Sequence, residues 1–279
     1  MYVWLNGPAI YDCQPPTYCM QTVDHHGRST AYRYRDVSES GGPGLCCIHG
    51  SGGSHAVWEG QFELADRTPV AAVDLSGHGE SEDIDADPGY ETLAGYAEDV
   101  VAVAEATDCR VLVGHSLGGA VALSVALDDD ISLAGLVLTA TGARLAVLSD
   151  LIDLLVTDFE QALSFLHGPD RLFHDPDPEI LERSRTLFAE TGQGVTVRDF
   201  KTANRFDERG RLGEIELPAT AIVGEHDRLT PLRYHRHFTA EMDCSLLRIE
   251  NAAHLLMLEQ PAVFNSAVEM FLDRLEADY

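Results

Sequence analysis

Short apolar runs alternate with longer amphipathic stretches along most of the chain. Each run is apolar or rich in β-branched residues and ends in glycine or polar residues. The runs are 44–50, 69–77, 109–116, 134–142, 219–227 and 245–254, and the stretches with helical spacing are 90–106, 117–127, 231–240 and 261–277. Short buried strands that alternate with helices are typical of a parallel sheet covered on both faces. We therefore predict an α/β fold with a mostly parallel, doubly wound sheet that binds its ligand at the carboxyl edge.

One long segment interrupts this alternation. Residues 143–210 contain helix-like stretches without a convincing strand, and the segment is too long for a simple connection. It holds six of the ten phenylalanines, at positions 159, 165, 173, 188, 200 and 206. We predict a helical cap at 143–210 inserted into a core formed by 24–142 and 211–279. Most of the six phenylalanines should form the cap's own small core, and one or two should face a substrate pocket.

The first residues differ in composition from the rest. Asp12 is the only charged residue in 1–23, and a strand-like pattern begins at Met20. We predict that 1–23 is an N-terminal arm, with residues 1–19 either disordered or preceding the true translation start at Met20.

The charge is strongly unbalanced. Asp and Glu number 46 against 19 Lys and Arg, for a formal net charge of −27, and Lys201 is the only lysine. Such a surface repels nucleic acid and anionic membranes, so we expect neither as a partner. No apolar run approaches the roughly 20 residues of a membrane helix, and no secretory signal precedes the fold. We predict a cytoplasmic protein, and the near-absence of lysine resembles proteins of salt-accumulating, halophilic cytoplasms.

The cysteines predict neither a disulfide nor a metal centre. Cys46 and Cys47 are adjacent on a strand-like run, so their side chains point to opposite faces. Cys13 and Cys19 precede the pair His25–His26, but the spacing matches no common zinc pattern.

The sequence GHSLG at 114–118 carries the first chemical signal. It fits G-x-S-x-G between a strand-like and a helix-like run, which is the context of a nucleophile elbow. The turn is so tight that side chains at Gly114 and Gly118 would collide with their surroundings. Ser116 would then stand at a helix N-terminus, where the dipole and free N–H groups favour negative charge. We predict that Ser116 is a nucleophile.

A serine needs a positioned base, and two later runs supply the partners. The run ending GEHDRLTP supplies Asp227, and the run ending NAAHLLMLEQP supplies His254. The order Ser, Asp, His is that of α/β-hydrolases. Glu225 is an alternative acid. Neighbouring polar residues are given other roles: His115 packs beneath the elbow, Asp74 is structural, His226 faces another way, and His235 and His237 lie on a surface helix.

From about residue 24 the chain resembles the α/β-hydrolase superfamily, above all its capped esterases, enol-lactonases and carbon–carbon-bond hydrolases. GHSLGG, GEHDRLTP and AAHLLMLEQP stand where that family has nucleophile, acid and base. Ala253 departs from the glycine that often precedes the family's histidine. The resemblance implies an oxyanion hole made by the amides of Leu117 and Ser51, with Gly52 as the alternative to Ser51.

These residues together predict a serine hydrolase. We expect it to cleave a small, largely apolar ester or lactone without cofactor or metal. Alternatives on the same three residues are carbon–carbon bond hydrolysis, acyl transfer and lyase chemistry. A rival of another class is a small-molecule signal receptor that keeps the fold but turns over slowly or not at all. The sequence does not indicate an oligomeric state.

Overall fold

The computed structural model describes residues 19–38, 41–128 and 131–277. Within them the chain forms an eight-stranded sheet in the order β1-β2-β4-β3-β5-β6-β7-β8. The strands are β1 (Cys19–His25), β2 (Arg28–Arg35), β3 (Gly44–Ile48), β4 (Val70–Val73), β5 (Cys109–His115), β6 (Gly135–Thr139), β7 (Ala219–Gly224) and β8 (Cys244–Ile249). Strand β2 pairs antiparallel with β1 and β4, and every other pairing is parallel. The predicted α/β fold with a mostly parallel sheet is confirmed.

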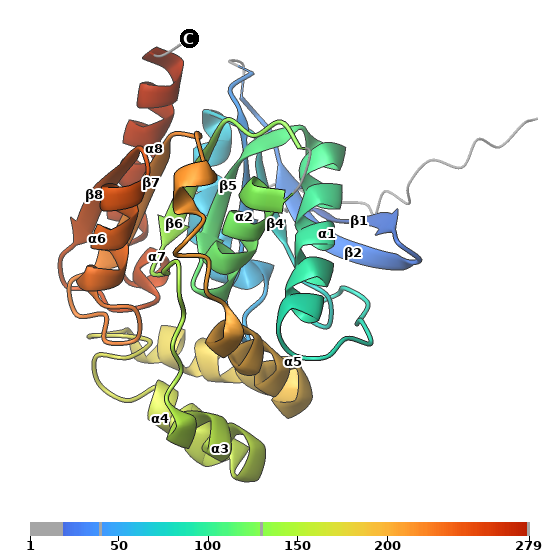
Figure 1. The fold of residues 1–279 in the computed structure, drawn as a ribbon, viewed down its shortest axis with the longest axis vertical. Helices are drawn as coiled ribbons and strands as arrows, with labels where there is room; N and C mark the ends of the chain where they lie inside the picture. Colours follow the sequence, from blue (N-terminus) through green and yellow to red (C-terminus); the bar gives the residue numbers. More distant parts are fainter. Residues whose placement is uncertain (1–18, 39–40, 129–130, 278–279) are drawn as a thin grey trace, which may run out of the picture.

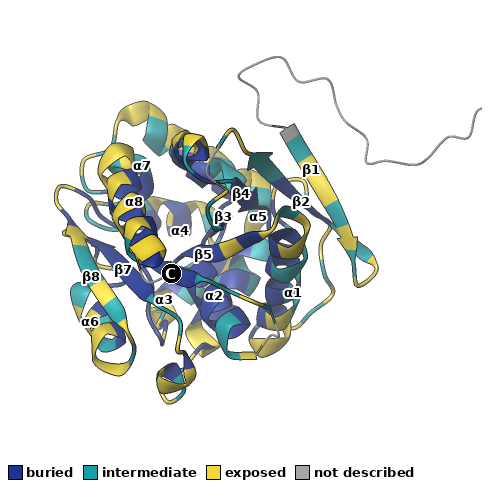
Figure 2. Ribbon diagram, turned by 90° about the horizontal axis from the view of Figure 1, so that it is seen from above, coloured by how far each residue is buried: buried dark blue, intermediate teal, exposed yellow. Residues whose placement is uncertain are grey.

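Helices cover both faces of this sheet (Figure 1). They are η1 (His55–Asp66), α1 (Tyr90–Thr107), α2 (Leu117–Asp128), α3 (Ser149–Thr157), α4 (Phe159–Leu166), α5 (Pro178–Arg205), η2 (Leu212–Glu214), α6 (Leu232–Glu241), α7 (Leu256–Glu259) and α8 (Pro261–Ala277). In Figure 2 the central strands are largely buried, whereas the edge strands β1 and β8 and the outer faces of the helices are exposed in part. Among the described helices, none is long and apolar enough to cross a membrane.

Strand alternation divides the core into two clusters. Val111 and Val113 of β5 pack with Phe62 of η1 and with residues of α7 and α8. Leu112, between them in sequence, packs on the other face with residues of α1, α2 and α6. Successive strand side chains point to opposite faces, so a sheet that is covered on both sides requires an apolar residue at every central position.

The segment between β6 and β7 forms the helices α3, α4 and α5. In Figure 1 these helices lie beyond the end of the sheet, away from the helices that cover its faces. Helix α5 is kinked at Gly192, whose φ is 80°. An antiparallel bridge joins Arg144 to Asp207, so the two ends of the segment lie side by side. We call residues 143–210 the helical segment.

The N-terminal boundary lies earlier than the sequence analysis placed it. Strand β1 spans Cys19–His25 and pairs with β2 along its whole length, so an arm ending at residue 23 would cut through a strand. The hairpin register explains the difference, because Cys19 is opposite Tyr34 and His25 is opposite Arg28. Residues 1–18, which contain the rest of the predicted arm, lie outside the described residues.

Candidate active site

Ser116 stands in a strained turn at the carboxyl edge of the sheet. Strand β5 ends at His115 and α2 begins at Leu117, so the turn consists of Ser116 alone. Its φ is 53°, in the left-handed region that residues with a side chain rarely adopt. The Ser116 N–H donates to Thr139 O (3.0 Å), and Thr141 Oγ1 donates to Ser116 O (2.7 Å). The neighbouring strand β6 and the residues after it therefore hold the turn in place.

The glycines on either side of this turn are required by close backbone packing. A Cβ at Gly114 would lie 2.5 Å from Gly118 O and 2.6 Å from Gly119 Cα. A Cβ at Gly118 would meet the carbonyl groups of Ile48 and His49, at the end of β3. Any side chain at either position would push α2 away from β5 or β3, so the tight turn depends on both glycines.

Asp227 and His254 meet at the same edge of the sheet. Asp227 follows β7 and His254 follows β8, and His254 Nδ1 lies 2.9 Å from Asp227 Oδ2. Both residues are buried, with exposed fractions of 5% and 4%. The imidazole therefore has a fixed orientation, with its Nδ1 side directed at the carboxylate.

Further donors hold the carboxylate of Asp227. Its Oδ1 accepts from the N–H groups of Leu229 (2.8 Å) and Thr230 (2.9 Å), and its Oδ2 accepts from Thr230 Oγ1 (2.7 Å). Burial alone would raise the pKa of Asp227, but the charge of His254 and these hydrogen bonds outweigh it and lower the pKa to about 2. Asp227 is therefore ionised at neutral pH. Sequence reasoning did not identify Thr230, although it lies within the GEHDRLTP motif.

Ser116 and His254 line one cavity of about 600 Å³. The loop after β3 forms part of its wall through residues 50–53. A Cβ at Gly50 would lie 3.0 Å from Ser116 Cβ, so this loop lies directly against the turn that carries the serine. The three residues predicted to be catalytic and the loop predicted to hold an oxyanion are thus brought together.

The hydrogen bonds of this loop bear on the choice between Ser51 and Gly52. The Gly52 N–H donates to Asp199 Oδ2 (2.9 Å), and the Gly53 N–H donates to Gly50 O (3.1 Å). An N–H already bound to a carboxylate is not available to a substrate oxyanion, which favours Ser51. Leu117 is the first residue of α2, where backbone N–H groups have no partner within the helix.

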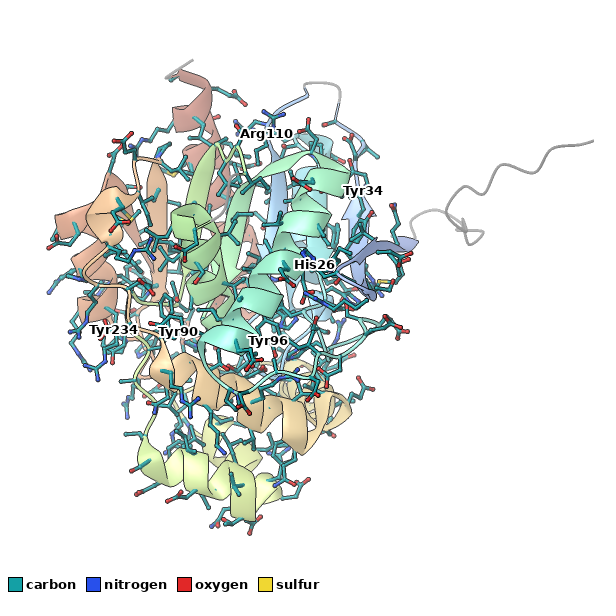
Figure 3. All side chains as sticks on the ribbon, turned by 45° about the vertical axis from the view of Figure 1, so that its right-hand side comes forward. His26, Tyr34, Tyr90, Tyr96, Arg110 and Tyr234 are labelled. Carbon is teal, nitrogen blue, oxygen red and sulfur yellow. The ribbon has the colours of Figure 1, made fainter. Side chains whose placement is uncertain are left out.

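Asp199 belongs to a buried network that sequence analysis did not predict. It lies on α5, is fully buried, and accepts from Tyr96 OH (2.6 Å) as well as from Gly52. His78 Nε2 lies 2.9 Å from Asp199 Oδ2. Burial alone would lower the pKa of His78, but the Asp199 carboxylate outweighs it and raises that pKa. Figure 3 shows Tyr96 at the end of α1 that lies closest to α5, so the network joins the helical segment to the core.

We expect Asp199→Asn to destabilise the protein, because an amide nitrogen cannot accept the hydrogen bonds that the carboxylate accepts. Removing one partner of a buried ion pair costs about 3–5 kcal/mol. Asp199, with a lowered pKa, stabilises the fold above its ordinary pKa of 3.8, and this contribution is lost as pH falls. His78, with a raised pKa, stabilises the fold below its ordinary 6.5, and this contribution is lost as pH rises through the raised value. The difference in unfolding free energy between wild type and variant should therefore be largest between pH 3.8 and 6.5.

Urea unfolding at pH 5 and pH 8 measures this difference. Glu190→Gln, an exposed acidic position on the same helix, is the control and should change little. Equal stability of Asp199→Asn and wild type at pH 5 would show that the network does not contribute as described.

The histidines near the site differ in burial and contacts. His115 is buried, with Nε2 3.1 Å from His254 O, and burial followed by the nearby His254 lowers its pKa well below the ordinary value. The helix that carries His235 has an exposed side, as predicted, but His235 itself is fully buried and its Nε2 accepts from Thr141 N (3.1 Å). Helix α6 packs against β7 and β8, and the face carrying His235 points inward. Burial lowers the pKa of His235 to about 4. His237 is only partly exposed.

Among the described residues, two groups of side chains have a spacing that suits a metal ion. They are His25, His26 and Glu98, and Asp170, His174 and His226. In each group an arginine already binds the carboxylate, Arg28 at 2.9 Å from Glu98 and Arg228 at 2.6 Å from Asp170. A guanidinium at the carboxylate repels a cation and competes with it for the negative charge. We therefore assign neither group to a metal. Cys13, which the sequence analysis considered with Cys19, His25 and His26, lies outside the described residues.

The chain belongs to the α/β hydrolase family, whose model matches residues 47–267. An uncharacterised protein of Mycobacterium tuberculosis (strain ATCC 25618 / H37Rv) is 30% identical over 97% of this chain and 85% of that protein. A pimeloyl-(acyl-carrier protein) methyl ester esterase of Neisseria meningitidis serogroup A is 30% identical over 81% of this chain and 75% of that enzyme.

Solved structures agree on the fold. The structure of a thermophilic esterase has a TM-score of 0.80 and 30% identity, and the match covers 93% of this chain and 99% of that one. The enol-lactonase from Burkholderia xenovorans LB400 also has a TM-score of 0.80, at 22% identity, over 90% of this chain and 99% of that one. The resemblance seen in the three motifs is thus confirmed at the level of the family and the fold.

Proposed function

We propose that the protein is a serine hydrolase that cleaves a small, largely apolar ester or lactone through an acyl-enzyme. The observation that carries the proposal is that His254, paired with the buried Asp227, lines one cavity with a serine held in a strained strand-to-helix turn. The esterases among the relatives and solved structures support the reaction type. Apolar residues of the helical segment that line the cavity support an apolar substrate.

In the proposed mechanism Ser116 Oγ attacks the carbonyl carbon and His254 Nε2 accepts the hydroxyl proton. The step needs a hydrogen bond between these two atoms, which is not among those made by the described residues. Such contacts often tighten only when substrate binds. Asp227 fixes the tautomer of His254 and stabilises its cation. The amides of Leu117 and Ser51 bind the oxyanion, His254 then protonates the leaving group, and water releases the acid.

The helical segment serves in this proposal as the lid of the cavity. Three of its six phenylalanines, Phe165, Phe188 and Phe200, line the cavity, one more than the largest number expected from the sequence. Phe173 and Phe206 are buried away from it. A lid of this kind excludes water from the acyl-enzyme and sets the shape of the acyl group that fits.

Labelling with a fluorophosphonate probe in molar KCl, followed by peptide mapping, tests the proposal. Stoichiometric label on Ser116 that is lost in Ser116→Ala and His254→Ala would establish an activated serine. Folded protein that takes no label would contradict the hydrolase and favour the signal receptor or a reaction without an acyl-enzyme. Esters of increasing acyl length would then define the substrate class.

We also propose that the protein works in concentrated salt. A net charge of −27 destabilises the compact state through self-repulsion, and molar salt shortens the screening length to about 3 Å. The melting temperature should rise with KCl, by about 2–4 °C for each kcal/mol gained. Scanning calorimetry from 0.1 to 2 M KCl checks this, with sorbitol of equal osmolality as the uncharged control. A rise of the same size in sorbitol would rule out charge screening as the cause.

A further inference from the structure

The cavity has a charge opposite to that of the whole protein. Acidic residues outnumber basic ones 46 to 19 in the chain. Among the described residues that line the cavity, none is Asp or Glu, whereas Arg171, Arg228 and Arg233 are all present. A neutral, apolar compound gains no binding energy from three guanidinium groups in the wall, so this lining indicates a ligand that carries negative charge.

The three arginines come from segments that adjoin the acid–base pair in space or in sequence. Arg171 lies between α4 and α5, and its carbonyl oxygen accepts from His254 N (3.3 Å). Arg228 directly follows Asp227 in the loop after β7, and Arg233 lies in the first turn of α6. The helical segment contributes apolar side chains such as Leu151, Leu187 and Phe188 to the rest of the lining. The cavity is therefore apolar over much of its wall, and its only charged lining side chains among the described residues, apart from His254 and His115 when protonated, are the three arginines.

Two of these arginines have no carboxylate partner among the described residues. Arg228 is paired with Asp170 at 2.6 Å. The Arg171 guanidinium lies 3.5 Å from the centre of the Phe165 ring and donates to Phe165 O. Arg233 lies over the ring of its neighbour Tyr234 at 5.1 Å. In the part of the chain that the structure describes, neither Arg171 nor Arg233 has a carboxylate within ion-pair distance.

We propose that this arginine cluster binds a carboxylate of the substrate, so that the ester or lactone carries an anionic group in addition to the carbonyl that is cleaved. The planar fork of a guanidinium matches a carboxylate and binds it with two parallel hydrogen bonds. The reaction itself rests on the function proposed above, and the carboxylate narrows its substrate class. The apolar wall accommodates the rest of the molecule.

Matched substrates test this specificity. The p-nitrophenyl monoester of adipic acid, which keeps one free carboxylate, is compared with p-nitrophenyl heptanoate, which has a methyl-terminated chain of similar length. Wild type should show a higher kcat/KM for the adipate ester. In Arg171→Gln and Arg233→Gln the ratio of the two kcat/KM values should fall on the order of 10- to 100-fold, mainly through KM, because a charge-assisted hydrogen bond is lost.

Arg236→Gln is the matched control, since Arg236 is exposed on the same helix as Arg233 and does not line the cavity. Its ratio should equal that of wild type. Arg233 is itself exposed, so its variant should fold even if Arg171→Gln does not. A wild type that prefers the heptanoate ester, or a ratio that falls equally in Arg236→Gln, would overturn the proposal.

A binding measurement separates this proposal from the hydrolase proposal. Calorimetric titration of Ser116→Ala with monomethyl adipate, which keeps one free carboxylate, and with methyl heptanoate, which has none, needs no turnover. Tighter binding of monomethyl adipate that is lost in Ser116→Ala/Arg233→Gln supports the arginine cluster even if no ester is cleaved. Equal binding of the two compounds would refute it even if esters are cleaved.

Discussion

Replacing Ser116 with alanine should lower kcat for ester hydrolysis by about 10⁶-fold while leaving the protein folded. The position of the Ser116 hydroxyl is set by a turn of one residue between β5 and α2. Alanine fits that turn as well as serine does, and it loses only Oγ. Residual hydrolysis would come from the oxyanion donors and from binding alone. Steady-state kinetics with a p-nitrophenyl ester, together with circular dichroism of the variant, measures both parts of the prediction.

Ser124→Ala is the control for this experiment. Ser124 is buried on α2, the helix that follows Ser116, and it does not line the cavity. Removing its hydroxyl tests whether the loss of a nearby hydroxyl alone lowers activity. Its kcat should stay within a few-fold of wild type. Ser116→Ala protein that retains more than a hundredth of the wild-type kcat would show that the serine is not the nucleophile.

The sequence predicted what depends on local geometry. The G-x-S-x-G turn, the strand ends that carry Asp227 and His254, and the alternation of strands and helices are each visible within a few consecutive residues. Their spatial meeting follows from the rule that parallel strands end at one edge. For that reason the order of the motifs was enough to predict that Asp227 and His254 lie close together. In the structure the two side chains are within hydrogen-bond distance.

Contacts between distant segments were not predictable in this way. Asp199 binds Gly52 across 147 positions of sequence, and nothing in the residues around Asp199 marks it as a partner of that loop. His235 and His237 were placed on a surface helix, two positions apart and so not on one helical face, but nothing in the local sequence showed that α6 buries the face that carries His235. The contact that favours Ser51 over Gly52 as the proposed oxyanion donor is likewise tertiary, since Gly52 N is bound by a side chain from α5.

Asp227→Asn should lower kcat by about 10⁴-fold with little change in KM. The carboxylate now accepts from Leu229 N, Thr230 N and Thr230 Oγ1, and its Oδ2 lies 2.9 Å from His254 Nδ1. An asparagine amide in the same position presents an N–H to one of these partners, which favours the tautomer of His254 that cannot accept the serine proton. The pKa of Asp227 is about 2, below its ordinary 3.8, so its ionised form is available from about pH 4 upward and its contribution to stability is lost only as pH falls toward 2.

Glu225→Gln tests whether Glu225, the alternative acid in the sequence analysis, orients His254 instead of Asp227. Glu225 is two residues away on the same loop, but it lies 3.5 Å from Arg248 and 3.8 Å from His226 and makes no ion pair with His254 among the described residues. We expect Glu225→Gln to keep wild-type kcat at every pH above 5, whereas Asp227→Asn is slow throughout that range. Comparable losses in the two variants would mean that the loop, rather than the carboxylate at Asp227, orients the histidine. Asp227→Asn and Glu225→Gln therefore compare two carboxylates on one short loop. The comparison tests whether the activity depends on the hydrogen bond between Asp227 and His254 or only on the presence of an acid after β7.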